Sequence, residues 1–133
     1  MSKLETLVPP LELCKKIPEG CFADSTLVWF GHPHTDKTMQ AVPRNELGAV
    51  CKRFLRMNIR VAYAAPTLAE IMGDIGKMGY FCPTVYHLGR WHASCEEASD
   101  TPTIWPKVHD ADDPSAAAAA LKLWLELEKV DHE

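Results

Sequence analysis

The stretch from Asp113 to Val130, DPSAAAAALKLWLELEKV, specifies its structure more clearly than any other part of the chain. Asp113 is predicted to be an N-cap, because its carboxylate can accept hydrogen bonds from the free N–H groups of a first helical turn. Pro114 then occupies the first helical position, where a missing N–H costs nothing. The five alanines that follow have the highest intrinsic helix propensity. The stretch therefore predicts a C-terminal helix.

Two adjacent rows of apolar side chains run along this predicted helix, with Ala117, Leu121, Trp124 and Leu125 in one row and Leu123, Leu127 and Val130 in the other. A stripe of that width is typical of a helix that closes a hydrophobic core. The polar face is narrow, and this leaves open a second interpretation, a helix that joins two copies of the chain.

Three further helices are predicted upstream. Apolar residues recur at helical spacing over residues 45–57, with Asn45 as the cap. Thr67 and Glu70 form a capping box at the start of the next helix, which two glycines end. A shorter helix is expected at residues 9–17, where prolines flank an amphipathic segment.

Strands are expected where apolar or β-branched residues run between turn residues, at 26–30, 38–42, 58–63, 80–88, 90–95 and 103–108. Residues 80–88 and 90–95 are predicted to form a hairpin that turns at Gly89. Helices and strands do not alternate regularly, which favours an α+β fold over α/β. The predicted core consists of Leu27, Trp29, Val50, Phe54, Leu68, Ile71, Val85, Leu121, Trp124 and Leu125.

We therefore predict a single compact α+β domain over residues 1–133. Its antiparallel sheet is expected to have about four strands, with the Thr67 helix and the C-terminal helix packed on one side. Five cysteines without a CxxC pair indicate reduced thiols. The sequence has no apolar run of transmembrane length, and its first residues lack the apolar segment of a signal peptide. The expected location is the cytoplasm, without membrane association.

Charge is unevenly distributed along the chain, whose net charge is −4. Residues 44–60 contain five basic residues and one acid, whereas residues 96–133 contain ten acids and three lysines. Such a division can steer a partner or join two copies. The candidate binding surface is the basic set Arg44, Lys52, Arg53, Arg56 and Arg60. Its partner is either a nucleic-acid backbone or the acidic region of a second copy, although a solvated helix face is the simpler interpretation.

Two motifs together resemble small bacterial proteins encoded in phages and prophages: APTLAEI at 65–71 and DDPSAAAAALKLWLEL at 112–127. The segments LELCKKIP at 11–18 and DSTLVW at 24–29 are similar to the usual opening of those proteins. The resemblance implies a compact intracellular α+β protein without an established activity, and it supplies no catalytic residue. We therefore expect a small accessory protein that acts by binding, to an unknown protein or to itself, and that needs no cofactor.

The alternative to a binding protein is a metal-dependent enzyme. His32, His34 and Asp36 lie within five residues and are ligand types that zinc accepts. The sequence has no HExxH motif and no pair of CxxC motifs, so a polar surface loop explains these residues better.

Two other kinds of site are less favoured. A thiolate at Cys95 or Cys82, with His92 or His87 as its base, is opposed by the acids that follow Cys95. The glycines of residues 73–79 are expected to end a helix rather than to bind phosphate.

Overall fold

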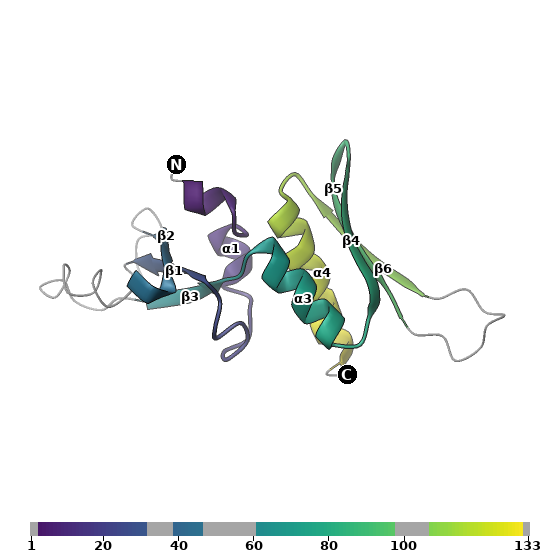
Figure 1. The fold of residues 1–133 in the computed structure, drawn as a ribbon, viewed down its shortest axis with the longest axis horizontal. Helices are drawn as coiled ribbons and strands as arrows, with labels where there is room; N and C mark the ends of the chain where they lie inside the picture. The colour runs from purple at the N-terminus through teal and green to yellow at the C-terminus, as the bar shows by residue number, and fades with distance from the viewer. Residues whose placement is uncertain (1–2, 32–38, 47–60, 98–106, 132–133) are drawn as a thin grey trace, which may run out of the picture. The chain divides into compact units, whose positions relative to one another are not determined.

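The computed structural model describes residues 3–31, 39–46, 61–97 and 107–131, and the chain divides into two compact units with the boundary after Thr67. Helices and antiparallel strands occur in both units, which confirms the α+β class (Figure 1). The prediction of one domain with a single sheet of about four strands is not correct in detail, because the described residues form two sheets of three strands each. In the first sheet β1 pairs with β2 and also with β3, which is not its neighbour in sequence. In the second sheet each strand pairs only with its neighbours in sequence.

The first unit is built on the sheet β2-β1-β3. Its elements are η1 (Lys3–Thr6), α1 (Leu11–Cys14), β1 (Leu27–Gly31), β2 (Gln40–Pro43), η3 (Arg44–Glu46) and β3 (Val61–Ala65). All five residues of the central strand β1 are buried, which explains its continuous apolar run. The Trp29 indole N–H donates to the carbonyl of Pro9 at 3.1 Å, so the segment before α1 is tied to the centre of the sheet.

The sequence located the strands of this unit well. The prediction at 26–30 is confirmed as β1, and those at 38–42 and 58–63 overlap β2 and β3. The predicted helix at 9–17 is shorter, because α1 ends at Cys14. The predicted helix over 45–57 lies mostly outside the described residues, as do the predicted core residues Val50 and Phe54, and 44–46 form a 3-10 turn.

The second unit is a three-stranded meander covered by two helices. Its elements are α3 (Leu68–Lys77), β4 (Phe81–Leu88), β5 (Arg90–Glu96), β6 (Val108–Asp113) and α4 (Ala116–Asp131). Figure 1 shows α3 and α4 side by side along one face of the sheet β4-β5-β6. The predicted hairpin is confirmed, and Gly89 at its turn has φ +72°, a conformation that glycine adopts readily.

Both apolar rows of α4 contribute to the core of this unit. Leu123 and Leu127 are fully buried together with Leu121 and Trp124, whereas Leu125 is only partly buried. The small side chains of 117–120 on α4 and of Ala93 on β5 are also buried, which lets the helix lie close to the sheet. Of the other predicted core positions in this unit, Ile71 is buried, and Leu68 and Val85 are half-buried.

The start of α4 differs from the prediction. Asp113 is the last residue of β6 rather than the N-cap, and its carboxylate accepts the N–H of Ser115 at 2.9 Å. The Ser115 hydroxyl accepts the N–H of Ala118 at 3.3 Å, so Ser115 is the residue that caps the helix. Asp113 pairs with Trp91 in the sheet, so the backbone of Asp113 is extended. The helix therefore begins after the position that the capping side chain of Asp113 suggested.

The third strand of the meander also lies elsewhere than predicted. The predicted strand at 103–108 falls almost entirely outside the described residues, and β6 occupies Val108–Asp113 instead. Aspartate is depleted in strands, so VHDADD gives a weak strand signal. The described residues include no helix with both the length and the apolar character needed to span a membrane.

Candidate binding surface

The face of the sheet β4-β5-β6 that is turned away from α3 and α4 is the candidate binding surface, and we call it the outer face. Successive residues of a strand point to opposite faces. Ala93 and Cys95 are buried beneath the helices, so their neighbours on β5 point outward. With the cross-strand register, the outer face comprises Thr84, Tyr86 and Leu88 on β4, Arg90, His92, Ser94 and Glu96 on β5, and Val108, Asp110 and Asp112 on β6.

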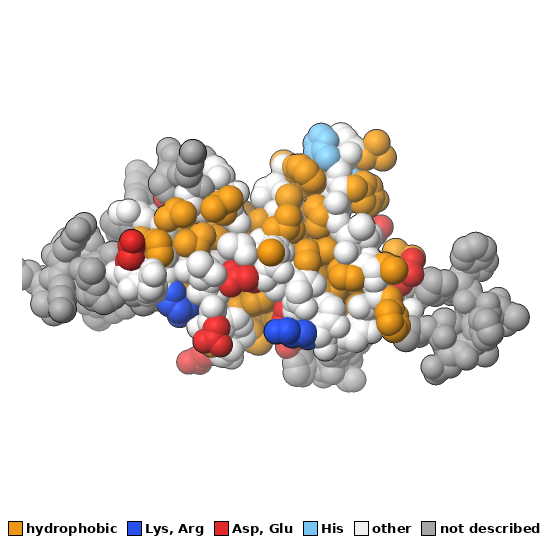
Figure 2. Space-filling model, in the orientation of Figure 1, with side chains coloured by type: hydrophobic (Ala, Val, Ile, Leu, Met, Phe, Trp, Pro, Cys, Tyr) orange, Lys and Arg blue, Asp and Glu red, His pale blue; other side chains and the backbone are white. Residues whose placement is uncertain are grey.

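The β4 side of the outer face is apolar. Leu88 is 75% exposed and Tyr86 is 46% exposed. The Tyr86 ring stacks on His92 with 5.0 Å between ring centroids and 12° between the planes. Nε2 of His92 in turn lies 3.3 Å from the Leu88 carbonyl oxygen, to which it can donate. Figure 2 shows hydrophobic side chains and a histidine at the tip of the β4–β5 hairpin. These contacts hold an exposed aromatic ring in a defined position.

The β6 side of the outer face is acidic. Arg90 Nε lies 3.0 Å from Asp112 Oδ2, and both side chains are about half exposed. Asp110 and Glu96 add two more carboxylates to the same face, and Arg90 is the one lysine or arginine among the residues named for it. The outer face therefore combines an apolar side with a negative side.

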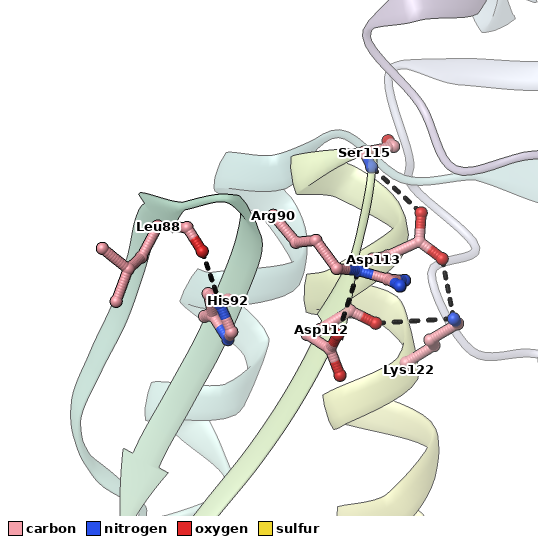
Figure 3. A network of polar contacts seen from close by, with 7 residues as sticks. All are labelled: Leu88, Arg90, His92, Asp112, Asp113, Ser115 and Lys122. Carbon is pink, nitrogen blue, oxygen red and sulfur yellow. Dashed lines mark hydrogen bonds and ion pairs between the residues drawn. The ribbon is translucent and has the colours of Figure 1, made fainter.

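Asp113, the last residue of β6, lies on the helix-facing side of the sheet and joins this end of the strand to α4 (Figure 3). Its carboxylate lies 2.7 Å from Lys122 Nζ and also accepts the Ser115 N–H. Burial alone would raise the pKa of Asp113, but the hydrogen bonds from Lys122 and Ser115 and the charges of Lys122 and Arg90 together hold this pKa below its usual value. These contacts join the acidic strand to the helix and to the turn before it.

The candidate nucleophile Cys95 and the candidate base His92 are not brought together. Cys95 points toward the helices and is buried, whereas His92 lies on the outer face of the same strand. Burial, aided by the negative charge of Glu97, raises the pKa of Cys95 to about 11, so its thiol stays protonated at neutral pH. Cys82 is exposed. The His87 ring packs edge-on against the Trp91 ring, with 5.0 Å between the ring centroids. This arrangement does not support a cysteine nucleophile at Cys95.

Arg44, the first residue of the predicted basic surface, has a structural role in the first unit. Its Nε donates to the Ser25 carbonyl at 2.7 Å, and its Nη2 donates to the Ser25 hydroxyl at 2.9 Å. The Ser25 residue itself is buried. The remaining predicted site residues lie outside the described residues, namely Lys52, Arg53, Arg56, Arg60, His32, His34 and Asp36.

Across the part of the chain that the structure describes, no three His, Cys, Asp or Glu side chains are grouped so that they could hold a metal ion. A hollow of about 470 Å³ does occur in the first unit, lined partly by Cys14, Arg44 and Tyr63. Burial raises the pKa of Cys14 to about 12, although a hydrogen bond with Trp29 acts in the opposite direction. The thiol is therefore protonated and the guanidinium is already bonded, so this hollow presents less available chemistry than the outer face does.

The sequence indicated only part of the outer face. The segments on either side of the turn at Gly89 identified the hairpin. The strand that carries Asp110 and Asp112 was not predicted, because the third strand was expected at 103–108. A scan against protein-family models, a search of curated proteins and a search of solved structures each found no match.

Proposed function

We propose that this chain acts by binding a partner protein rather than by catalysis, as a small cytoplasmic accessory protein of the phage and prophage type that its motifs resemble. The observation that carries the proposal is the two-sided chemistry of the outer face. Exposed Leu88 and Tyr86 lie on one side of it, and Asp110 and Asp112 lie on the other. Such a face suits a partner surface that carries apolar residues beside lysine or arginine.

The two sides would contribute differently to binding. Covering Leu88 and Tyr86 removes apolar area from water, which stabilises a complex by about 25 cal/mol per Å² before the costs of association. Because stacking on His92 already holds the Tyr86 ring in place, the ring loses little side-chain entropy when a partner binds. Aromatic side chains of this kind are common anchors in protein interfaces. The carboxylates of β6 would orient a basic partner and speed its encounter rather than supply most of the affinity.

The two alternatives depend on residues outside the described part of the chain. A nucleic-acid interface would rest on Lys52, Arg53, Arg56 and Arg60, since Arg44 is bonded to Ser25. A metal-dependent enzyme would rest on His32, His34 and Asp36. The acids of the outer face would repel phosphates, so this face favours a protein partner over a nucleic acid.

A peptide-display selection against the full chain tests the proposal. We expect enriched peptides to carry basic residues beside aliphatic or aromatic ones, and we expect Asp110→Lys to weaken their binding at least tenfold. Glu126→Lys makes the same change of charge on α4, on the other side of the sheet, and is expected to leave binding unchanged. Peptides without basic residues, or equal effects of the two substitutions, would contradict the proposal.

A further inference from the structure

The two edges of the second sheet differ sharply in charge. β4 and β6 are both edge strands, because the strand order is β4-β5-β6. β6 has three aspartates in six residues, whereas the eight residues of β4, FCPTVYHL, include no Lys, Arg, Asp or Glu. An edge strand presents unpaired N–H and C=O groups, and proteins commonly protect such edges with charges. By this criterion β6 is protected and most of β4 is not.

We propose that β4 pairs with β4 of a second copy in antiparallel orientation, which would join the two sheets into one. The pairing would share Leu88 and Tyr86 with the partner surface proposed above. It is tested separately, because it concerns the edge of the sheet and needs no molecule other than the chain itself. It also differs from association through the basic segment 44–60, which would use opposite charges instead of an uncharged strand.

Local irregularities define which part of β4 can pair. The register with β5 shifts between Phe81 and Thr84, Cys82 has φ +52°, and Pro83 has no N–H to donate. The hairpin turns at Gly89 at the other end. The regular segment is therefore residues 84–88, with Tyr86 at its midpoint.

A two-fold antiparallel pairing that uses this whole segment places Tyr86 opposite Tyr86 of the other copy. It also places Thr84 of each copy opposite Leu88 of the other, all on the outer face. Pairs of this kind are the unit of stabilisation between strands. The pairing would cover part of Leu88 and Tyr86, two of the large apolar side chains that are exposed in the described chain.

Charge explains why β4 rather than β6 is the edge that pairs. Pairing through β4 puts the two acidic β6 strands at opposite ends of the joined sheet, about 24 Å apart at the spacing of neighbouring strands. That distance exceeds the Debye length of about 8 Å at physiological ionic strength. Pairing through β6 would instead set aspartates against aspartates. Both free edges of the pair are acidic, so assembly is expected to stop at two copies.

Sedimentation equilibrium of the full chain tests the pairing. The contact is small, so we expect the weight-average mass to rise from 14.8 kDa towards twice that value as the concentration increases. Tyr86→Lys places two like charges opposite each other and is expected to weaken association at least tenfold. Ser94→Lys introduces the same charge on the central strand β5 and is expected to have no such effect. Circular dichroism would verify that both variants are folded.

A cysteine introduced at the midpoint gives a second readout. Cross-strand Cα atoms in an antiparallel pair lie about 4.5–5.5 Å apart, within the range of a disulfide. In a Cys82→Ser background, Tyr86→Cys is expected to form a covalent dimer under mild oxidation, and Ser94→Cys is not. A monomer at every concentration would overturn the proposal. A dimer that survives Tyr86→Lys and does not cross-link at position 86 would also overturn it, and would point to a different interface.

Discussion

Replacing Trp124 with phenylalanine removes the hydrogen bond that joins α4 to α3. The indole Nε1 donates to Asp74 Oδ2 at 2.7 Å, and the Trp124 residue is only 2% exposed. A hydrogen bond to a charged acceptor contributes about 1.5–3 kcal/mol. The smaller ring also leaves unfilled space, which costs about 1 kcal/mol more. We therefore expect the free energy of unfolding to fall by about 3 kcal/mol, a large share of the ~5–15 kcal/mol of a typical domain.

The partner substitution Asp74→Ala isolates the hydrogen bond from the packing of the ring. It leaves the indole N–H without this acceptor, which costs about 1–3 kcal/mol. Asp74 lies in the C-terminal half of α3, where the helix dipole disfavours a carboxylate. Removing this carboxylate therefore stabilises the helix by about a few tenths of a kcal/mol and offsets part of the loss. The single variant therefore understates the strength of the bond.

Urea denaturation of the full chain and of the two single and one double variants gives the coupling energy. Far-ultraviolet circular dichroism is the suitable signal, because one substitution removes a fluorescent tryptophan. Residues that are bonded to each other are expected to couple by about 1–2 kcal/mol. Effects of Trp124→Phe and Asp74→Ala that add to within ~0.3 kcal/mol would show that the contact contributes nothing, and would refute the reasoning.

Three more predictions follow from single residues. Gly89→Val forces a branched side chain into positive φ and is expected to cost about 1–2 kcal/mol, seen as a fall of several degrees in the melting temperature. Lys122→Met removes the ion pair with Asp113 and is expected to lower the free energy of unfolding by about 1 kcal/mol at neutral pH. The pKa of Asp113 is lowered in the folded chain, so this contribution is present above the unfolded pKa and is lost as the pH falls through the folded value. Alkylation of the native chain near pH 8 is expected to modify exposed Cys82 well before Cys95, as measured by mass spectrometry.

Each of these predictions has a control or a result that contradicts it. Gly76 lies in α3 with nothing within 4 Å of an added Cβ, so Gly76→Ala should stabilise the chain slightly, unlike the substitution at Gly89. A loss on Lys122→Met that is the same at pH 2 and pH 7 would show that the Asp113 charge is not involved. Equal alkylation rates at Cys82 and Cys95 would contradict the burial of Cys95.

The sequence predicted the elements that local chemistry specifies. Helical spacing located α4 and its buried rows, and the glycine between two apolar strands located the β4–β5 hairpin. What it missed depends on contacts that are distant in sequence. The carboxylate of Asp113 looked like a helix cap, because its pairing with Trp91 in the sheet could not be seen from its neighbours.

The acidic half of the candidate surface was missed for the same physical reason. Which edge of a sheet is free, and which residues share its outer face, follow from strand order and register rather than from any local pattern. Arg44 shows the converse error. It counted as part of a basic surface until its two hydrogen bonds to Ser25, nineteen residues away, showed its role in the first unit.

Amide hydrogen exchange, followed across a range of protein concentrations, tests most directly whether the β4-β5-β6 sheet is an interaction surface. Residues 84–88 of β4 are expected to become more protected as the concentration rises, because pairing occupies N–H groups that face solvent in the single chain. The acidic edge strand β6 is expected to show no such change. Protection of β4 that stays constant with concentration, or that changes equally in β6, would contradict this account.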